Sequence, residues 1–221
     1  MIDKKFIYAG PSWAVLSYDI EQGDPSTCTS LLKEWKLEDV AINISTRGDN
    51  FGGQMKKLAS LNSDLPIVYI SCEPLQQFKE GPYSYIEEES NIMNFRKNIH
   101  RENMLSLCQL PNQVAVIGAH TDITDSYNVV IDRSWQNFLL RDAGLPERYN
   151  WGAEVLHNHW HISDNKFKDK QMINEMSEQF DVWKKLVEAG LMCGVHPTTK
   201  GNKLYADYTY DKIKEFLDDN T

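Results

Sequence analysis

The sequence lacks several patterns that mark large classes of proteins. No block of Lys and Arg occurs, and the formal net charge of the 221-residue chain is −9. Because a nucleic-acid-binding domain usually carries a basic face, we expect no nucleic-acid partner. No apolar run approaches the ~20 residues that a membrane helix needs, and the first ten residues contain no signal-peptide core. We therefore expect a soluble cytoplasmic protein that does not bind a membrane.

Cysteine is also scarce. The four cysteines, Cys28, Cys72, Cys108 and Cys193, lie far apart and form no CxxC pair. We interpret those in or beside apolar segments as buried free thiols in a reducing compartment. Neither GxGxxG nor GxxxxGK[ST] occurs, so the sequence supports neither a Rossmann dinucleotide site nor a P-loop. We expect no cofactor.

What the sequence does contain is a regular alternation of two patterns. Short apolar runs rich in Val, Ile and Tyr are typical of buried strands, and they cover residues 5–10, 40–45, 66–71 and 113–120. Apolar residues at helical spacing cover residues 28–37, 52–61, 84–108, 126–143, 167–189 and 201–217. This alternation predicts βαβ units. We predict one α/β domain over residues 1–221, with three layers and a mostly parallel sheet of four or five strands flanked by helices.

One stretch, residues 144–166, shows no clear periodicity, and we predict a surface excursion near the functional site. On a strand, its alternating His157, His159 and His161 would share one face, as metal ligands sometimes do. No carboxylate or cysteine at standard spacing completes such a set, so we predict no metal site. If the stretch folds over the site, one of these histidines would instead contact substrate.

In parallel sheets the ligand site lies beyond the carboxyl ends of the strands, so the residues after each strand are candidates. The first strand is followed by Gly10-Pro11-Ser12-Trp13. Gly10 allows a tight turn, and Ser12 is then either a displayed hydroxyl or the N-cap of a helix. We expect Trp13 to line the pocket wall.

The next two strands are also followed by polar residues. After the second, the backbone N–H of Gly48 and the side chain of Asn50 can donate to an anionic oxygen, although a polar turn with a helix cap fits equally. After the third, Glu73 stands where a polar site residue is expected, before Pro74, which either ends the strand or starts a helix.

Near the C-terminus, the stretch CGVHPTTKGNKLYADY places His196 before a proline, which favours an extended backbone, and ahead of a helix expected to start at Gly201. The segment is either a plain loop between helices or one that holds His196 for acid–base chemistry. In a doubly wound sheet, Ser12 and His196 can reach the same edge. A hydroxyl nucleophile needs an adjacent base, and imidazole titrates near neutral pH.

These residues occur in the order found in one family. YAGPSW, NISTRGDN and GVHPTTKGNKLYADYTYDKI resemble the first, second and last blocks of the SGNH (GDSL-like) hydrolases, and Trp after the serine resembles SGNH-like proteins of tailed bacteriophages. The resemblance implies a flavodoxin-like fold, with Ser12 as nucleophile, His196 as general base and Gly48 as oxyanion donor. It also implies an ester hydrolase acting on a small acyl ester or a carbohydrate O-acyl ester.

The chain departs from the family pattern at three places. Pro11 precedes the serine where the family has Asp, Cys193 stands in place of the Asp before the histidine, and Cys72 or Glu73 occupies the place of the third-block Asn. Loss of one oxyanion donor typically lowers kcat about 10²–10³-fold. The alternative is therefore a phage-encoded SGNH-fold binding or structural protein that has lost catalysis.

Overall fold

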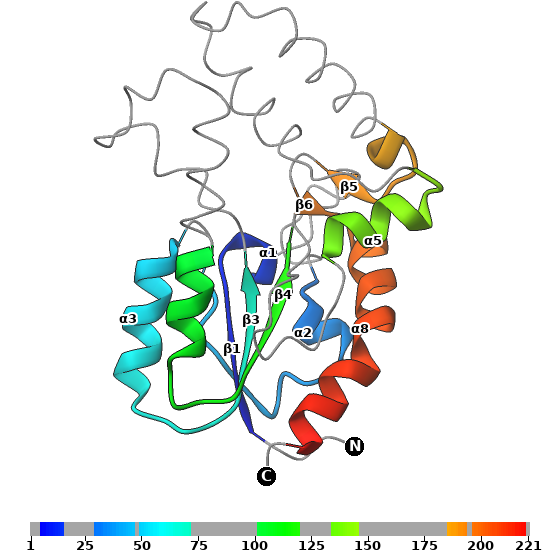
Figure 1. Cartoon of the computed structure of the whole chain (residues 1–221). Coiled ribbons are helices and arrows are strands. Elements are labelled where there is room, and N and C mark those ends of the chain that lie inside the picture. Colours follow the sequence, from blue (N-terminus) through cyan, green and yellow to red (C-terminus); the bar gives the residue numbers. More distant parts are fainter. Residues whose placement is uncertain are drawn as a thin grey trace, which may run out of the picture.

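A parallel β-sheet forms the centre of the part of the molecule that the structure describes (Figure 1). The computed structural model describes residues 5–15, 29–46, 49–71, 101–119, 134–145, 185–193 and 196–219. The sheet has four strands in the order β2-β1-β3-β4, and every pairing is parallel. The strands are β1 (Phe6–Ala9), β2 (Ala41–Asn43), β3 (Ile67–Ser71) and β4 (Val114–Gly118). Each lies within a predicted apolar run, and the predicted α/β class is confirmed.

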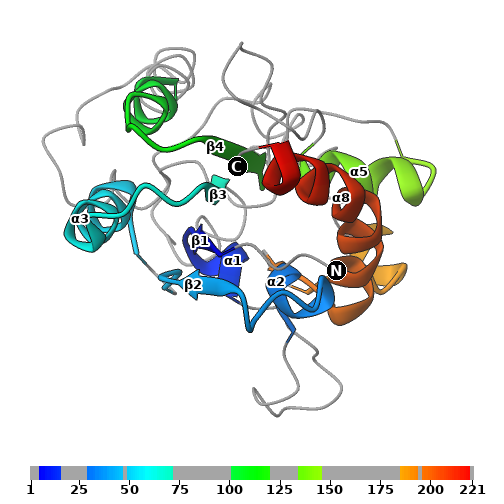
Figure 2. The same ribbon diagram turned by 90° about the horizontal axis from the view of Figure 1, so that it is seen from below.

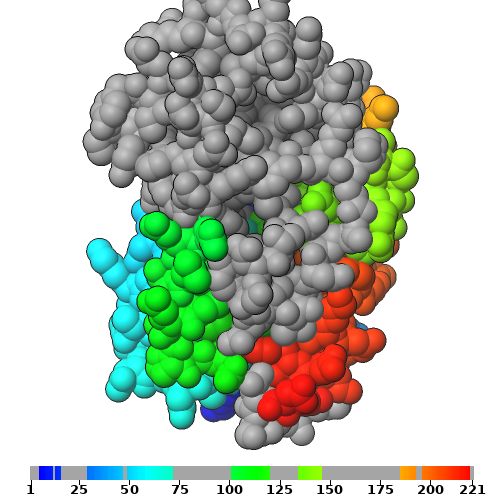
Figure 3. All heavy atoms as spheres, in the orientation of Figure 1, coloured from blue at the N-terminus to red at the C-terminus, as the bar shows by residue number. Residues whose placement is uncertain are grey.

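Helices flank this sheet on both sides (Figure 2). They are α1 (Ser12–Val15), α2 (Leu31–Glu34), α3 (Phe51–Leu61), α5 (Trp135–Asp142) and α8 (Thr199–Asp219), and residues 101–108 and 185–188 are also helical. In the space-filling view, α3 and residues 101–108 occupy one side of the molecule, and α8 and α5 the other (Figure 3). No helix within the described residues is long and apolar enough to cross a membrane.

Alternate side chains of each strand point to opposite faces of the sheet, and this divides the core into two parts. On one face, Tyr8 and Ile70 pack with apolar residues of α2, α5 and α8. On the other face, Ile7 and Tyr69 pack with Leu58 of α3 and with residues 101–108. The three layers that the sequence predicts follow from this division.

The strand order places β1 between β2 and β3. Helix α2, which precedes β2, covers one face of the sheet, and α3, which follows β2, covers the opposite face. The chain therefore crosses from one face of the sheet to the other between β1 and β3. The carboxyl ends of two such strands form the usual ligand-binding crevice of open α/β sheets. Ser12 follows β1 at this edge.

A second, smaller sheet precedes α8. Met192–Cys193 (β5) pairs antiparallel with His196–Pro197 (β6), an element that the sequence pattern did not predict. The Thr198 hydroxyl then donates to Gly190 O at 2.6 Å and accepts from the N–H of Gly201 at 3.1 Å. Helix α8 therefore begins at Thr199, slightly earlier than the predicted start at Gly201.

Helix α8 is joined to α2 through Trp35, the residue that caps α2. The indole N–H of Trp35 lies 3.2 Å from Ala206 O and 3.1 Å from Thr209 Oγ1, so both oxygens accept from it. Gly201, near the start of α8, packs so closely on the chain before β5 that a Cβ there would collide with Leu191 O. These contacts fix α8, and with it the adjacent β6, against the sheet.

Candidate functional site

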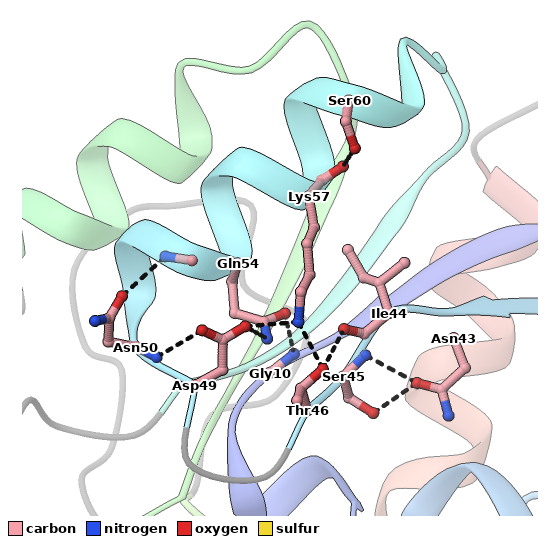
Figure 4. Close-up of polar contacts among 11 residues, drawn as sticks. Gly10, Asn43, Ile44, Ser45, Thr46, Asp49, Asn50, Gln54, Lys57 and Ser60 are labelled. Carbon is pink, nitrogen blue, oxygen red and sulfur yellow. Dashed lines mark hydrogen bonds and ion pairs between the residues drawn. The ribbon is translucent and has the colours of Figure 1, made fainter.

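The site begins with the turn at Gly10, directly after β1. Gly10 has φ +145°, and a Cβ at this position would lie 2.8 Å from Ile70 O. Its N–H donates to Gln54 Oε1 at 3.2 Å, and its carbonyl accepts from the N–H of Thr46 at 3.1 Å (Figure 4). A glycine is required here because the backbone turns sharply while it touches β3.

Ser12 is the first residue of α1, and its backbone stands at the carboxyl end of β1. The short helix closes with the Ala14 N–H donating to Pro11 O at 2.9 Å. The Tyr8 hydroxyl donates to Ala14 O at 3.1 Å and ties the helix back to the strand from which it came. The turn that contains residue 12 is therefore fixed by a hydrogen bond from β1, the strand that precedes it.

A polar network supports this turn from the α3 side (Figure 4). Gln54, which is fully buried, accepts from Gly10 and donates through Nε2 to Asp49 Oδ2 at 2.8 Å. The same carboxylate oxygen lies 2.7 Å from Lys57 Nζ, and that ammonium also donates to Thr46 Oγ1 at 2.6 Å. Hydrogen bonds and an ion pair among these side chains thus join the segments after β1 and β2 to α3.

Asn50 is the N-cap of α3. Its Oδ1 accepts from the N–H of Gly53 at 2.8 Å, which is the cap interpretation that the sequence left open. The capping bond uses the amide oxygen, so the amide nitrogen remains the atom that would donate to an oxyanion. That role for Asn50 stays a prediction.

His196 is half-buried and lies against Trp13. The centroid of its ring is 6.2 Å from that of the Trp13 indole, and the two planes are inclined by 38°. Trp13, only 2% exposed, makes a T-shaped contact with Trp135 at 5.3 Å. Trp135 in turn stacks on Tyr205 of α8 at 5.1 Å. A continuous row of aromatic rings therefore runs from the residue after Ser12 to α8.

The described residues include only part of the predicted site. Trp13 and His196 are brought together, whereas Asn50 caps α3. Gly48, Glu73 and the side chain of Ser12 lie outside the described residues. So do the three clustered histidines, His157, His159 and His161. Within the described part of the chain, no group of three or more His, Cys, Asp or Glu side chains is placed to hold a metal ion.

The sequence reasoning missed three residues of the polar network, Asp49, Gln54 and Lys57. The available signal was Gln54, a polar residue one turn before Leu58 on the buried face of α3. A glutamine at such a position needs buried hydrogen-bond partners, which the neighbouring loop provides.

Comparisons of the chain with protein-family models, with curated proteins and with solved structures found no match.

Proposed function

We propose that this protein is an SGNH-like ester hydrolase that uses Ser12 and His196 as a catalytic dyad. The observation that supports the proposal best is the 6.2 Å contact between the rings of His196 and Trp13, the residue directly after Ser12. It sets the imidazole beside α1, at the carboxyl end of a parallel sheet, where ligands of such folds bind.

In the proposed reaction, the Ser12 hydroxyl attacks the acyl carbonyl while His196 accepts its proton. The tetrahedral intermediate collapses when the bond to the leaving alcohol breaks and His196 returns the proton to that alcohol. Water then attacks the acyl-enzyme with His196 again as base, which releases the acid and restores Ser12. The N–H groups of Ser12 and Gly48, with the Asn50 amide, would stabilise the oxyanion.

A dyad needs its imidazole held in one orientation. In this chain the family's orienting Asp is replaced by Cys193, whose backbone pairs with His196 across the β5–β6 ribbon. Trp13 provides an apolar surface beside the ring, and Trp135 and Tyr205 hold that surface in place. We infer that packing against Trp13 helps to orient the His196 imidazole in place of the family's Asp.

The test is hydrolysis of p-nitrophenyl acetate by the wild type, Ser12→Ala and His196→Gln. Each variant should lose at least 10³-fold in kcat, because removal of one triad member from a serine hydrolase typically costs about 10⁴-fold or more. Ser60→Ala, an exposed serine on α3, is the matched control and should retain full activity. A fluorophosphonate should label Ser12, with the modified peptide identified by mass spectrometry.

A second candidate function is a binding protein that keeps this fold without the chemistry. It is favoured by the register of the β5–β6 ribbon, in which a cysteine rather than a carboxylate is paired with His196. In that case Ser12→Ala would hydrolyse the ester no more slowly than the wild type, and the fluorophosphonate would leave Ser12 unmodified.

A further inference from the structure

Lys57 of α3 bonds to both ends of a short stretch of the loop between β2 and α3. Its ammonium donates to Thr46 Oγ1 at 2.6 Å and lies 2.7 Å from Asp49 Oδ2 (Figure 4). The backbones of the same two residues are joined as well, because the N–H of Asp49 donates to Thr46 O at 3.3 Å. In the sequence, Gly48, the proposed oxyanion donor, stands between them. One lysine therefore anchors the chain on both sides of that donor.

The bonds of Lys57 are part of a closed ring of contacts. From Asp49 the ring continues through the Gln54 amide, which donates to Asp49 Oδ2 and accepts from the N–H of Gly10. The carbonyl of Gly10 accepts from the N–H of Thr46 at 3.1 Å, and the Thr46 hydroxyl leads back to Lys57. Because Gly10 begins the turn after β1, the ring fixes the β2–α3 loop relative to the turn that leads to the proposed nucleophile.

Helix α3 carries a glycine that admits the carboxylate of this ring. A Cβ on Gly53, in the first turn of the helix, would collide with Asp49 Oδ1. The φ of Gly53 is not positive, so its backbone conformation does not require a glycine. Glycine weakens a helix because it loses more backbone entropy on folding than any other residue. The close approach of Asp49 therefore accounts for glycine at this position.

The ion pair of the ring contributes little to stability. The side chains of Lys57 and Asp49 are 38% and 18% exposed, and ion pairs in contact with water stabilise a fold only weakly. A weak ion pair that also requires an unfavourable residue in a helix is not what stability alone would favour. Departures of this kind occur mainly at functional sites.

The chemistry of the proposed site explains why the loop must be fixed. An oxyanion donor acts only when it lies ~2.7–3.1 Å from the oxygen that becomes negative, and a displacement of ~1 Å lowers the rate about 100-fold. Glycine leaves the backbone more freedom than other residues do. A donor N–H that belongs to Gly48 therefore depends on neighbouring residues for its position.

We propose that Lys57 is a positioning residue, which holds the N–H of Gly48 at a fixed place relative to Ser12 through its bonds to Thr46 and Asp49. The inference deepens the proposed function and rests on it, because it concerns the stabilisation of the oxyanion in that reaction. Loss of Lys57 should affect the transition state much more than it affects substrate binding or the fold.

The first experiment measures kcat and KM of Lys57→Met with p-nitrophenyl acetate. Its kcat should fall about tenfold or more while KM changes less than about twofold, because the oxyanion forms only in the transition state. Lys57→Arg keeps the charge and the donors and should retain at least about a third of kcat. Lys56→Met, an exposed neighbour outside the ring, should keep full activity. The melting temperatures should stay within about 4 °C of the wild type, which shows that each variant folds.

A second variant separates positioning from a direct effect of the lysine charge on the substrate. Thr46→Val keeps the ammonium and its ion pair with Asp49 but removes the hydroxyl to which Lys57 bonds. Because Thr46 is exposed, this variant should be as stable as the wild type. A positioning role predicts that kcat falls about threefold or more, the effect of one hydrogen bond. An unchanged kcat would assign the effect of Lys57 to its charge and would overturn the inference.

Binding of phenylboronic acid provides a readout of the oxyanion site without turnover. This acid forms a tetrahedral adduct with a serine nucleophile and so resembles the transition state. Its inhibition constant should rise about tenfold or more in Lys57→Met, in parallel with the loss of kcat. An inhibition constant that is equal in Lys57→Met and the wild type would contradict the positioning role.

The outcomes distinguish failure of this inference from failure of the proposed function. Hydrolysis that depends on Ser12, falls in Lys57→Met and returns in Lys57→Arg would support both. Hydrolysis that depends on Ser12 but is unchanged in Lys57→Met would retain the hydrolase and overturn the positioning role. Hydrolysis as fast in Ser12→Ala as in the wild type would remove the hydrolase and the positioning role together.

Discussion

The imidazole of His196 and the indole of Trp13 lie with their ring centroids 6.2 Å apart, although the two residues come from opposite ends of the chain. Two features produce this contact. The Gly10 turn directs the chain from β1 into α1, and the β5–β6 ribbon delivers His196 immediately before α8. The contact joins the C-terminal ribbon to the helix that follows β1.

We predict that Trp13→Phe shifts the ring-proton resonances of His196 in the NMR spectrum, because a smaller aromatic ring alters the field at the imidazole. His196→Gln identifies the resonances. Trp35→Phe is the control, since Trp35 is equally buried but contacts Tyr8 and α8. If both variants move the His196 signals to the same extent, the shift reflects general loosening and the packing of Trp13 on His196 is not supported.

Cys193→Asp should raise the esterase activity. Residue 193 is paired with His196 in the register of the ribbon, and opposite residues of an antiparallel pair have Cβ atoms about 4.5–5.5 Å apart. A carboxylate there would orient the imidazole and stabilise the imidazolium, so we expect kcat to rise about tenfold or more. Cys193→Asn, which has the same shape without the charge, should gain less. Equal rates for both variants would show that residue 193 does not act on the dyad.

Gly10→Ala should destabilise the protein by at least ~3 kcal/mol, because it combines a positive φ with a Cβ 2.8 Å from Ile70 O. Gly144→Ala is the matched control. Gly144 also has a positive φ, +68°, but a Cβ there meets no described atom within 4 Å, so only the strain of ~1–2 kcal/mol remains. Urea unfolding of both variants measures the difference, and equal losses would contradict the close approach of β1 to β3 at Gly10.

Lys57→Met should cost only ~0.5–1 kcal/mol of stability, because the ion pair with Asp49 is partly exposed, with side-chain exposures of 38% and 18%. The loss should shrink in 1 M salt, where charges are screened beyond about 3 Å. Lys56→Met, an exposed neighbour with no ion pair among the described residues, should be neutral at both salt concentrations. A loss for Lys57→Met that does not depend on salt would assign the effect to packing rather than charge.

The core strands could be predicted from the sequence because their signal is local. The strand IVYIS, residues 67–71, is buried on both faces, so all of its residues except Ser71 are apolar or aromatic and the run has the length of a strand. The β5–β6 ribbon gives no such signal, since each of its strands has only two residues. The early start of α8 depends on the Thr198 hydroxyl, which bonds to Gly190 across the ribbon, a contact that no helical period reveals.

The site was only partly predictable for a related reason. The place of Trp13 at the carboxyl end of β1 follows from its position directly after that strand, and the cap role of Asn50 follows from its place before α3. The burial of Gln136 on α5 has no signal in the sequence, because burial depends on distant parts of the chain. Gln54 was visible only as a polar residue on an apolar helix face.

The indole of Trp35 has consequences for how the protein is made. Its hydrogen-bond partners, Ala206 and Thr209, lie 171 and 174 residues later in the chain, so a ribosome must synthesise that whole stretch before they exist. Until then, the side of the sheet that carries Tyr8 and Ile70 lacks α8, the longest of the described helices that cover it, and exposes apolar surface. Pairings between such distant segments slow folding, and exposed intermediates of this kind are prone to aggregate. This protein should therefore depend on chaperones during synthesis more than its size alone suggests.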